Sequence, residues 1–296
     1  MKFSRQNNLL ILHLTVLVWG FTGILGALIS INEIQLVWYR VLIGSTTLFV
    51  YLKWAKIDLN IDKITFIKLF FTGAIVGLHW ILFFGAIKAS TVSVTMVCLS
   101  SLTLFTAVLE PLLSKNKIST LDILVGLCII FGIYLIFKFE TQYQKGIIMG
   151  LSSALCASLF SIINSKQVQN RSAVIIGFYE LLGAFFWVSI YLIFTGGFNV
   201  NMRLNQLDFI YLMILGTICT SLAYVAGVSV MKELSAFRVA LITNLEPIYA
   251  IILAIIIFGD TEKMTLGFYS GAIIILGSIF LYPVVKNRIS IKNFKN

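Results

Sequence analysis

The chain has 296 residues and a net charge of +10, and 59% of its residues are hydrophobic while only 11% are charged. A soluble domain carries about 25% charged residues, so this chain has too few to cover a globule in water. Its mean hydropathy of +0.99 instead indicates a protein that lies in a lipid bilayer. The basic residues occur in short gaps between apolar runs, which favours a role in membrane orientation over nucleic-acid binding.

The first apolar run covers residues 9–31 and follows Lys2 and Arg5. It is longer than the core of a secretory signal peptide, which has about 7–15 apolar residues. Further apolar runs follow at once, so we expect an uncleaved first span.

Ten apolar runs are long enough to cross a bilayer, which takes about 20 residues for about 30 Å of hydrocarbon. Five lie in the first half of the chain, at 9–31, 34–52, 69–87, 90–113 and 119–137. Five lie in the second half, at 146–165, 173–195, 209–231, 235–258 and 264–285. The runs are continuous rather than alternating, which indicates helices and not barrel strands. The sequence therefore predicts an all-α polytopic membrane protein with ten transmembrane helices.

The distribution of lysine and arginine predicts the orientation of these spans. If the N-terminus is cytoplasmic, sixteen of the 22 basic residues lie inside, five lie outside, and Arg40 falls within a span. Basic residues accumulate in cytoplasmic loops. We therefore expect a multi-pass protein of the cell (inner or plasma) membrane with both termini in the cytoplasm.

The two halves of the chain repeat one pattern. Trp38-Tyr39-Arg40 aligns with Phe178-Tyr179-Glu180 at an offset of 140 residues, and the pair Gly126 and Gly132 aligns with Gly271 and Gly277 at an offset of 145. Each unit has five spans, an odd number, so the two copies must be inverted relative to each other. This predicts one five-helix repeat over 9–138 and a second over 146–285, with a binding site near the middle of the membrane.

Motifs in five places carry a family resemblance: Trp19-Gly20, Arg40, Ala223-Tyr224, Asn244-Leu245-Glu246-Pro247 and Phe258-Gly259-Asp260. In this order and spacing they resemble the EamA family of the drug/metabolite transporter superfamily, over residues 9–285. The family more often has Glu where this chain has Asp260. The resemblance implies a ten-span carrier that moves amino acids, metabolites or drug-like compounds by secondary transport, without implying one substrate.

Glu246 is a candidate proton or cation site near the middle of the ninth run. Pro247 follows it and lacks the backbone N–H, which leaves a carbonyl free one turn back. Asn244 belongs to the same motif. Burial favours the neutral form of a carboxyl group, which allows proton binding. The alternative is a neutral, hydrogen-bonded glutamate that fixes helix packing.

Glu180 and Arg40 occupy matching positions in the seventh and second runs. A charge inside a membrane costs roughly 2.5–3.5 kcal/mol on insertion scales, so such residues mark function or interior packing. In an inverted repeat the two lie at different depths, and we do not expect them to pair directly. The alternative is that each side chain reaches toward its nearest interface.

His79 and Trp80 lie at the centre of the third run. Histidine can relay protons or bind a substrate, although a lone histidine is more often a packing residue. Trp19, Tyr179 and Tyr224 are further aromatic candidates for the wall of a cavity that suits amino acids or drug-like solutes. The alternative places these rings in the core or at the membrane interface.

Several features favour a structural role. Glu110 falls near the cytoplasmic end of the fourth run, where water can solvate it. The four cysteines, Cys98, Cys128, Cys156 and Cys219, lie in apolar runs without CxxC spacing, which predicts buried side chains and no disulfide or metal site. Pairs of glycines at GxxxG spacing suit close helix contacts, either within one chain or in a homodimer; these are Gly73 and Gly77, Gly146 and Gly150, and Gly267 and Gly271.

The chain lacks the motifs GxxxxGK[ST], HExxH and GxSxG, which disfavours an ATP-driven pump, a metalloprotease and a serine hydrolase. We expect no cofactor and no metal. The favoured interpretation is a secondary transporter that exports small solutes by alternating access. The alternative is an integral membrane enzyme, or a structural or sensor protein, without transport. The inverted repeat favours the transporter, while the substrate and the coupling ion stay open.

Overall fold

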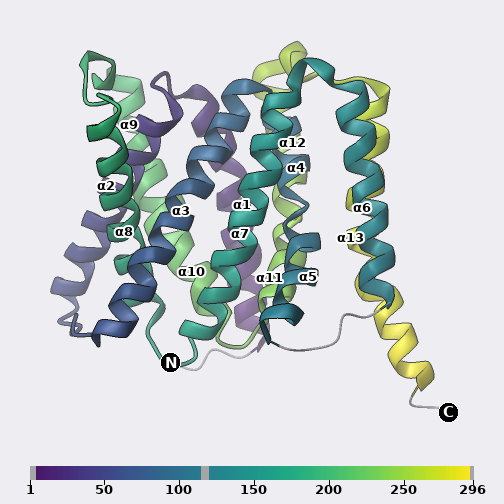
Figure 1. Cartoon of the computed structure of the whole chain (residues 1–296), viewed down its shortest axis with the longest axis horizontal. Coiled ribbons are helices and arrows are strands. Elements are labelled where there is room, and N and C mark those ends of the chain that lie inside the picture. The colour runs from purple at the N-terminus through teal and green to yellow at the C-terminus, as the bar shows by residue number, and fades with distance from the viewer. Residues whose placement is uncertain (1–4, 115–119, 294–296) are drawn as a thin grey trace.

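The computed structural model describes residues 5–114 and 120–293. The predicted loop at 115–119, with its lysines and the first residue of the fifth run, lies outside the described residues, as do the two chain ends. Helices and short connections make up the described part of the chain, which contains no strand. Figure 1 shows the helices running side by side in one bundle, with the start of α1 and the end of α13 at the same end of it.

The helices follow the apolar runs closely. The first half contains α1 (Arg5–Leu28), α2 (Glu33–Trp54), α3 (Lys63–Ala89), α4 (Val92–Leu99), α5 (Leu102–Ser114) and α6 (Thr120–Phe139). The second half begins with η1 (Thr141–Tyr143), α7 (Gln144–Gln167), α8 (Ala173–Phe194), η2 (Val200–Met202), α9 (Gln206–Gly216), η3 (Thr217–Leu222) and α10 (Ala223–Val230). It ends with α11 (Ala236–Thr243), α12 (Leu245–Phe258), η4 (Gly259–Glu262) and α13 (Leu266–Asn293).

Within the described ranges, eight helical segments are long and apolar enough to cross a membrane. They are Asn7–Leu28, Glu33–Trp54, Lys63–Ala89, Val92–Leu113, Thr141–Gln167, Ala173–Phe194, Gln206–Val230 and Ala236–Glu262. Two shorter apolar segments, Leu124–Phe139 in α6 and Leu266–Tyr282 in α13, pack against each other beside the main bundle (Figure 1). The prediction of an all-helical, multi-pass membrane protein is thus confirmed.

Polar side chains at the helix starts fix where the spans begin. Asn32, Asp62, Thr91 and Asn205 precede α2, α3, α4 and α9, and each side chain accepts a hydrogen bond from a backbone N–H in the first turn. Such caps satisfy amides that have no partner inside the helix. The polar gaps seen in the sequence therefore set the ends of the spans.

Two predicted spans, 90–113 and 235–258, are interrupted in their middles, although each was expected as one run. Ser100 and Ser101 separate α4 from α5, and Asn244 separates α11 from α12. In the second case Pro247 has no N–H to bond to the carbonyl of Thr243 four residues earlier. In the first case the Ser101 hydroxyl donates to the Cys98 carbonyl at 2.7 Å, an alternative to the regular helix pattern.

A π-helical turn, η3, interrupts the predicted span 209–231. The hydroxyls of Thr220 and Ser221 donate to carbonyls five residues earlier, on Leu215 at 2.7 Å and Gly216 at 2.9 Å. Such turns re-aim side chains and are frequent at functional sites. Here the turn brings Thr220 to Arg40 on α2.

The glycine pairs serve contacts within the chain. A Cβ atom on Gly73 would fall on the backbone of α8, at the carbonyl oxygen of Glu180. Gly132 on α6 and Gly271 on α13 face each other in the same way, because a Cβ on Gly132 would lie 2.8 Å from the Gly271 carbonyl oxygen. Because these glycines have no side chains, the helices that carry them can approach this closely. A homodimer stays a prediction.

Two smaller expectations change with the structure. Cys128 is exposed on α6, whereas the other three cysteines are buried as predicted. Glu110 is half-buried, and its Oε2 accepts a hydrogen bond from the Phe237 backbone N–H at 3.0 Å. The backbone at the start of α11, rather than water alone, therefore supplies a hydrogen bond to this carboxyl group.

Candidate functional site

A cavity of about 90 Å³ lies inside the bundle. One water molecule needs about 10–15 Å³ of such space, so the cavity has room for several waters or for part of a small solute. Its walls come from α1, α2, α3, α7, α10, α11, α12 and both residues that flank the break between α4 and α5. Six of the ten predicted site residues line it: Trp19, Arg40, His79, Trp80, Tyr224 and Glu246.

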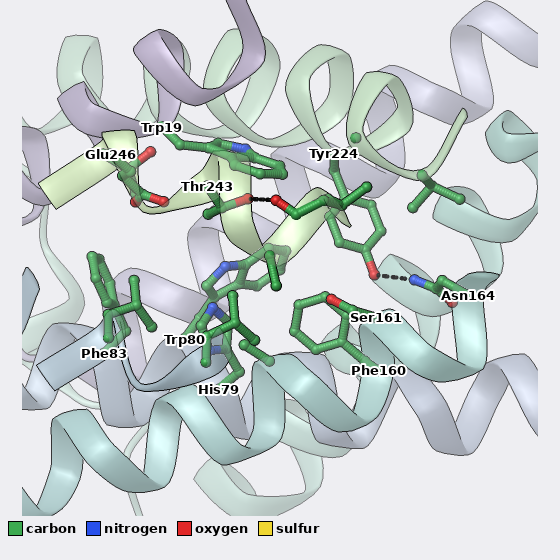
Figure 2. A pocket seen from close by; sticks show the side chains of 18 of the residues that line it. Trp19, His79, Trp80, Phe83, Phe160, Ser161, Asn164, Tyr224, Thr243 and Glu246 are labelled. Atoms are coloured by element: carbon green, nitrogen blue, oxygen red, sulfur yellow. Dashed lines mark hydrogen bonds between the residues drawn. The ribbon is translucent and has the colours of Figure 1, made fainter. Parts of the chain in front are cut away.

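Glu246 lies in the first turn of α12, directly after the break between α11 and α12. Figure 2 shows its carboxylate beside Trp19 at one end of the cavity. The side chain is 5% exposed, and no hydrogen bond or ion pair to another described residue holds the carboxylate. The positive end of the α12 dipole lies behind it. Glu246 is therefore placed to receive a positively charged or hydrogen-bond-donating group.

Arg40 supplies a positive charge to the same cavity. Its Nε donates to Thr220 Oγ1 at 2.6 Å, and its guanidinium carbon lies 4.1 Å from the centre of the Trp80 ring. One terminal nitrogen, Nη1, has no hydrogen-bond partner among the described residues. Arg40 and Glu246 are not joined by an ion pair within 4.0 Å. The cavity thus holds a basic group and an acidic group that are not paired with each other.

Burial excludes one interpretation of the charged residues. Arg40 is 2% exposed and Glu180 is not exposed at all. Neither side chain reaches toward a membrane interface, so that alternative is wrong. Both are held inside the bundle by polar partners instead.

His79 is fixed by the neighbouring helix α7. Its Nδ1 lies 3.0 Å from the carbonyl oxygen of Ser153 and 2.8 Å from the hydroxyl of the same residue. Because a carbonyl oxygen only accepts, this contact places the proton on Nδ1. When the ring is neutral, Nε2 is then its acceptor atom.

Aromatic rings form much of the remaining wall. The Tyr224 ring lies 5.9 Å from the ring of Trp80 and 6.1 Å from that of Phe160, and His79 lies 5.4 Å from Phe160. Figure 2 shows these rings around one common space. An aromatic wall with a few polar groups suits a solute that has an apolar body.

Four predicted site residues do not line the cavity. Asn244 and Pro247 shape the helix break behind Glu246. Glu180 lies in a second layer, where its Oε2 accepts hydrogen bonds from Tyr224 Oη at 2.7 Å and from Asn164 Nδ2 at 3.1 Å. Tyr179 points elsewhere and donates to the carbonyl of Leu59, at 2.7 Å, in the loop before α3.

Sequence reasoning missed a further set of lining residues, which includes Thr22, Phe83, Phe160, Ser161, Asn164 and Thr243. Asn164 carried a usable signal, because a carboxamide inside a span is costly unless it has partners. The others are small polar or aromatic residues of the kind that fill most spans. Among the described residues, no cluster of three histidine, cysteine or acidic side chains could hold a metal ion.

A buried cavity lined by polar and aromatic groups inside a multi-pass helical bundle is a feature that membrane carriers share. The sequence pattern of the EamA-like transporter family matches residues 7–138 and again residues 144–282. The chain belongs to this family, and the predicted resemblance is confirmed. It is a membrane transporter of the drug/metabolite type, and not an enzyme.

The chain is also similar to two individual proteins, one in sequence and one in fold. An uncharacterized transporter of Clostridium kluyveri is 25% identical over 219 residues, which are 71% of this chain and 68% of that protein. A protein of known crystal structure superposes with a TM-score of 0.70 at 13% sequence identity, over 95% of this chain and 99% of the other. The second likeness concerns the fold alone.

Proposed function

We propose that the protein is a secondary transporter that moves small solutes by alternating access, with ten spans in two inverted five-helix halves, 9–138 and 146–285. In this scheme α6 and α13 are the fifth and tenth spans. The observation that carries the proposal is the central cavity, in which Arg40 presents a basic group and Glu246 an acidic group between aromatic walls. Three reciprocal contacts support the inverted halves.

The first contact involves the aligned tyrosines of the second and seventh spans. Tyr39 donates to the carbonyl of Met202 at 3.0 Å, in the loop between α8 and α9. Tyr179 donates to the carbonyl of Leu59 at 2.7 Å, in the loop between α2 and α3. Each half therefore anchors the corresponding loop of the other half.

The second contact joins the starts of the third and eighth spans to equivalent turns. Asp208, in the first turn of α9, accepts from the Ser30 backbone N–H at 2.9 Å, in the turn between α1 and α2. Asp62, at the start of α3, pairs with Arg171 in the turn between α7 and α8. Ser30 and Arg171 are 141 residues apart, close to the offset of the repeat.

The third contact joins the two interrupted spans. Glu262, beyond the end of α12, accepts from the backbone N–H groups of Val92 and Ser93 at 3.0 and 2.9 Å, at the start of α4. Glu110, in α5, accepts from the backbone N–H of Phe237 at the start of α11. Discontinuous helices at corresponding positions in two halves are typical of carrier binding sites.

The cavity suits a solute that carries both signs of charge on an apolar body, as amino acids, many metabolites and many drug-like compounds do. Arg40 offers a planar donor group to an anionic part of the solute. Glu246 and the nearby Trp19 receive a cationic part. Trp80 and Tyr224 contact the apolar body, and His79 and Asn244 hold the adjoining wall and helix break in shape.

Transport is driven by an ion or solute gradient, since the sequence carries no ATP-binding motif of the Walker type. Most basic residues fall in the loops on the same side of the membrane as the N-terminus. This excess supports a cell-membrane protein with both termini in the cytoplasm. The direction we propose is export.

The test is a thermal-stability screen of the purified full-length protein against amino acids and cationic drugs, followed by flux in proteoliposomes. A compound at 100 times its Kd raises the free energy of unfolding by about 2.7 kcal/mol. We expect the stabilising compound to be transported by the natural protein and by Arg203→Lys, an exposed control, but not by Arg40→Gln. Stabilisation without flux in the natural protein would contradict a carrier.

A further inference from the structure

The carboxyl group of Glu180 is unusual in having all its hydrogen bonds on one oxygen. Its Oε2 accepts from Tyr224 Oη and Asn164 Nδ2, whereas Oε1 has no partner among the described residues. The side chains of Glu180 and Asn164 are completely buried. The amide oxygen Oδ1 of Asn164 is likewise buried and without a partner.

The part of the chain that the structure describes offers no ion-pair partner to balance a negative charge on this carboxyl group. Within the described residues, Glu180 forms no ion pair with a lysine, arginine or histidine. The only titratable group that faces it from α10 is Tyr224, and α7 contributes the neutral Asn164.

The other helices packed against α8 turn their charged groups elsewhere. On α2, Arg40 donates to Thr220, while Glu33 and Lys53 lie in the end turns of the helix. On α3, His79 contacts Ser153, Lys88 donates to the Ile29 carbonyl, and Lys63 and Lys68 are exposed. Gly73 lies against the backbone carbonyl of Glu180 on this side.

A carboxylate in such surroundings is costly, because burial of an unpaired charge in a protein interior is penalised by several kcal/mol. A protonated carboxyl group differs in that it has an O–H donor as well as an acceptor. Its neutral Oε2 still accepts from Tyr224 and Asn164, and its proton occupies Oε1, the atom without a partner. The hydrogen-bond pattern therefore fits the neutral acid.

Tyr224 and Asn164 connect this buried acid to the solute cavity. Both side chains line the cavity, whereas Glu180 does not. Asn164 Nδ2 also donates to Tyr224 Oη at 3.1 Å (Figure 2). The tyrosine hydroxyl is thus in contact with Glu180 and with Asn164, and both Tyr224 and Asn164 belong to the cavity wall.

We propose that Glu180 is a proton-binding site that exchanges its proton with water in the cavity through the hydroxyl of Tyr224. In the loading step, Tyr224 passes its O–H proton to Oε2 of the Glu180 carboxylate and takes up a proton from a hydronium ion, which becomes water. A half-turn of the carboxyl group about its Cγ–Cδ bond then exchanges the two oxygens, so that the protonated oxygen takes the place of Oε1. Release is the reverse of these steps. Asn164 is a positioning residue that orients the oxygens Glu180 Oε2 and Tyr224 Oη.

This inference deepens the proposed function and rests on it, since it supplies a coupling ion for a secondary transporter. It assigns different roles to the two buried acids, because their surroundings differ. Glu246 faces the cavity and can contact a solute, whereas Glu180 is shielded by Tyr224 and Asn164 and can exchange a proton without direct solute contact.

The first test is infrared spectroscopy of the purified full-length protein at neutral pH, which detects the carbonyl stretch of a protonated carboxyl group. We expect a band that is lost in Glu180→Gln and retained in the matched variant Glu246→Gln. If Glu180→Gln does not fold, Glu180→Asp should shift the same band. A spectrum without such a band, or a band that neither Glu180 variant changes, would overturn the proposal.

The second test is the rate at which this band shifts after transfer into D2O. We expect Tyr224→Phe to slow the shift at least tenfold, because phenylalanine cannot pass a proton, and Tyr191→Phe, on the exposed side of α8, to leave the rate unchanged. An equal rate in Tyr224→Phe would overturn the relay. Neither test requires transport, so a failed flux assay and a failed proton site are distinguishable.

Discussion

The side-chain amide of Asn244 donates to the hydroxyl of Thr103 at 2.5 Å, and this bond joins the two helix breaks. Thr103 follows the break between α4 and α5, and Asn244 is the break between α11 and α12. Asn244 also donates to the carbonyl of Ala240 at 2.8 Å. The two interrupted spans therefore meet at their interruptions, beside the cavity that Glu246 faces.

Replacement of this hydroxyl should loosen the contact between the breaks. Hydrogen bonds between membrane helices contribute about 0.6 kcal/mol on average and at most about 1.7 kcal/mol. Thr103→Val keeps the shape but removes the acceptor, so we expect a loss of about 1 kcal/mol in the thermal unfolding of the purified protein. Thr103→Ser keeps the hydroxyl and should retain most of the stability. Equal stability of all three proteins would show that the bond is unimportant.

The two glycines Gly73 and Gly77 should respond differently to alanine. A Cβ on Gly73 meets the backbone of α8, which cannot move aside as a side chain can. We expect Gly73→Ala to destabilise the protein by about 1–3 kcal/mol. A Cβ on Gly77 finds ordinary contacts of 3.4 Å or more, and alanine favours a helix over glycine by up to about 1 kcal/mol. Gly77→Ala should therefore be neutral or stabilising, and the reverse order would contradict the α3–α8 packing.

Arg40→Lys should impair solute binding although it keeps the charge. Lysine has neither the planar group that lies on Trp80 nor an Nε atom to donate to Thr220. We expect about tenfold weaker binding, or about 1.4 kcal/mol, measured by the stabilisation that a bound solute gives. Arg203→Lys, at an exposed position, is the matched control. Unchanged affinity in Arg40→Lys would remove this residue from the site.

Because of Asp62, the stability of the folded protein should depend on pH in the acid range. The backbone N–H and hydroxyl of Thr65, together with the nearby Arg171, hold the pKa of Asp62 below its ordinary value of 3.8. A lowered pKa in the folded state means that the carboxylate stabilises the protein above the unfolded pKa and loses this effect as the pH falls through the folded pKa. We expect the natural protein to be more stable than Asp62→Asn at pH 7, with the difference shrinking as the pH falls below the ordinary value of 3.8 and disappearing below the lowered pKa of the folded protein. A difference that persists in acid would contradict this account.

Hydropathy alone placed the spans well, because continuous apolar runs and polar caps such as Asn32 and Asp62 leave little choice of helix ends. The break at Asn244 was foreshadowed by Pro247. The break at Ser100 and Ser101 was not, since serines occur in many unbroken membrane helices, and this break is marked only by the contact between the neighbouring Thr103 and Asn244.

The candidate site was harder to derive, because the choice of cavity-lining residues depends on the rotation of each helix. Tyr179 and Glu180 are neighbours in sequence, yet one contacts a loop and the other contacts Tyr224. Arg40 and Glu246 stood out because intramembrane charges are rare. Asn164 was overlooked, although it holds the hydroxyl of Tyr224 and the carboxyl group of Glu180 together.

The most direct test of the transporter as a whole is the accessibility of one cavity residue from both sides of the membrane. Ser161→Cys, in a protein without its four native cysteines, places a thiol in the cavity wall with little change of size. Alternating access predicts that a membrane-impermeant maleimide labels this thiol both from outside right-side-out vesicles and from outside inverted ones. Labelling from one face only, at every pH and with every stabilising compound, would contradict it.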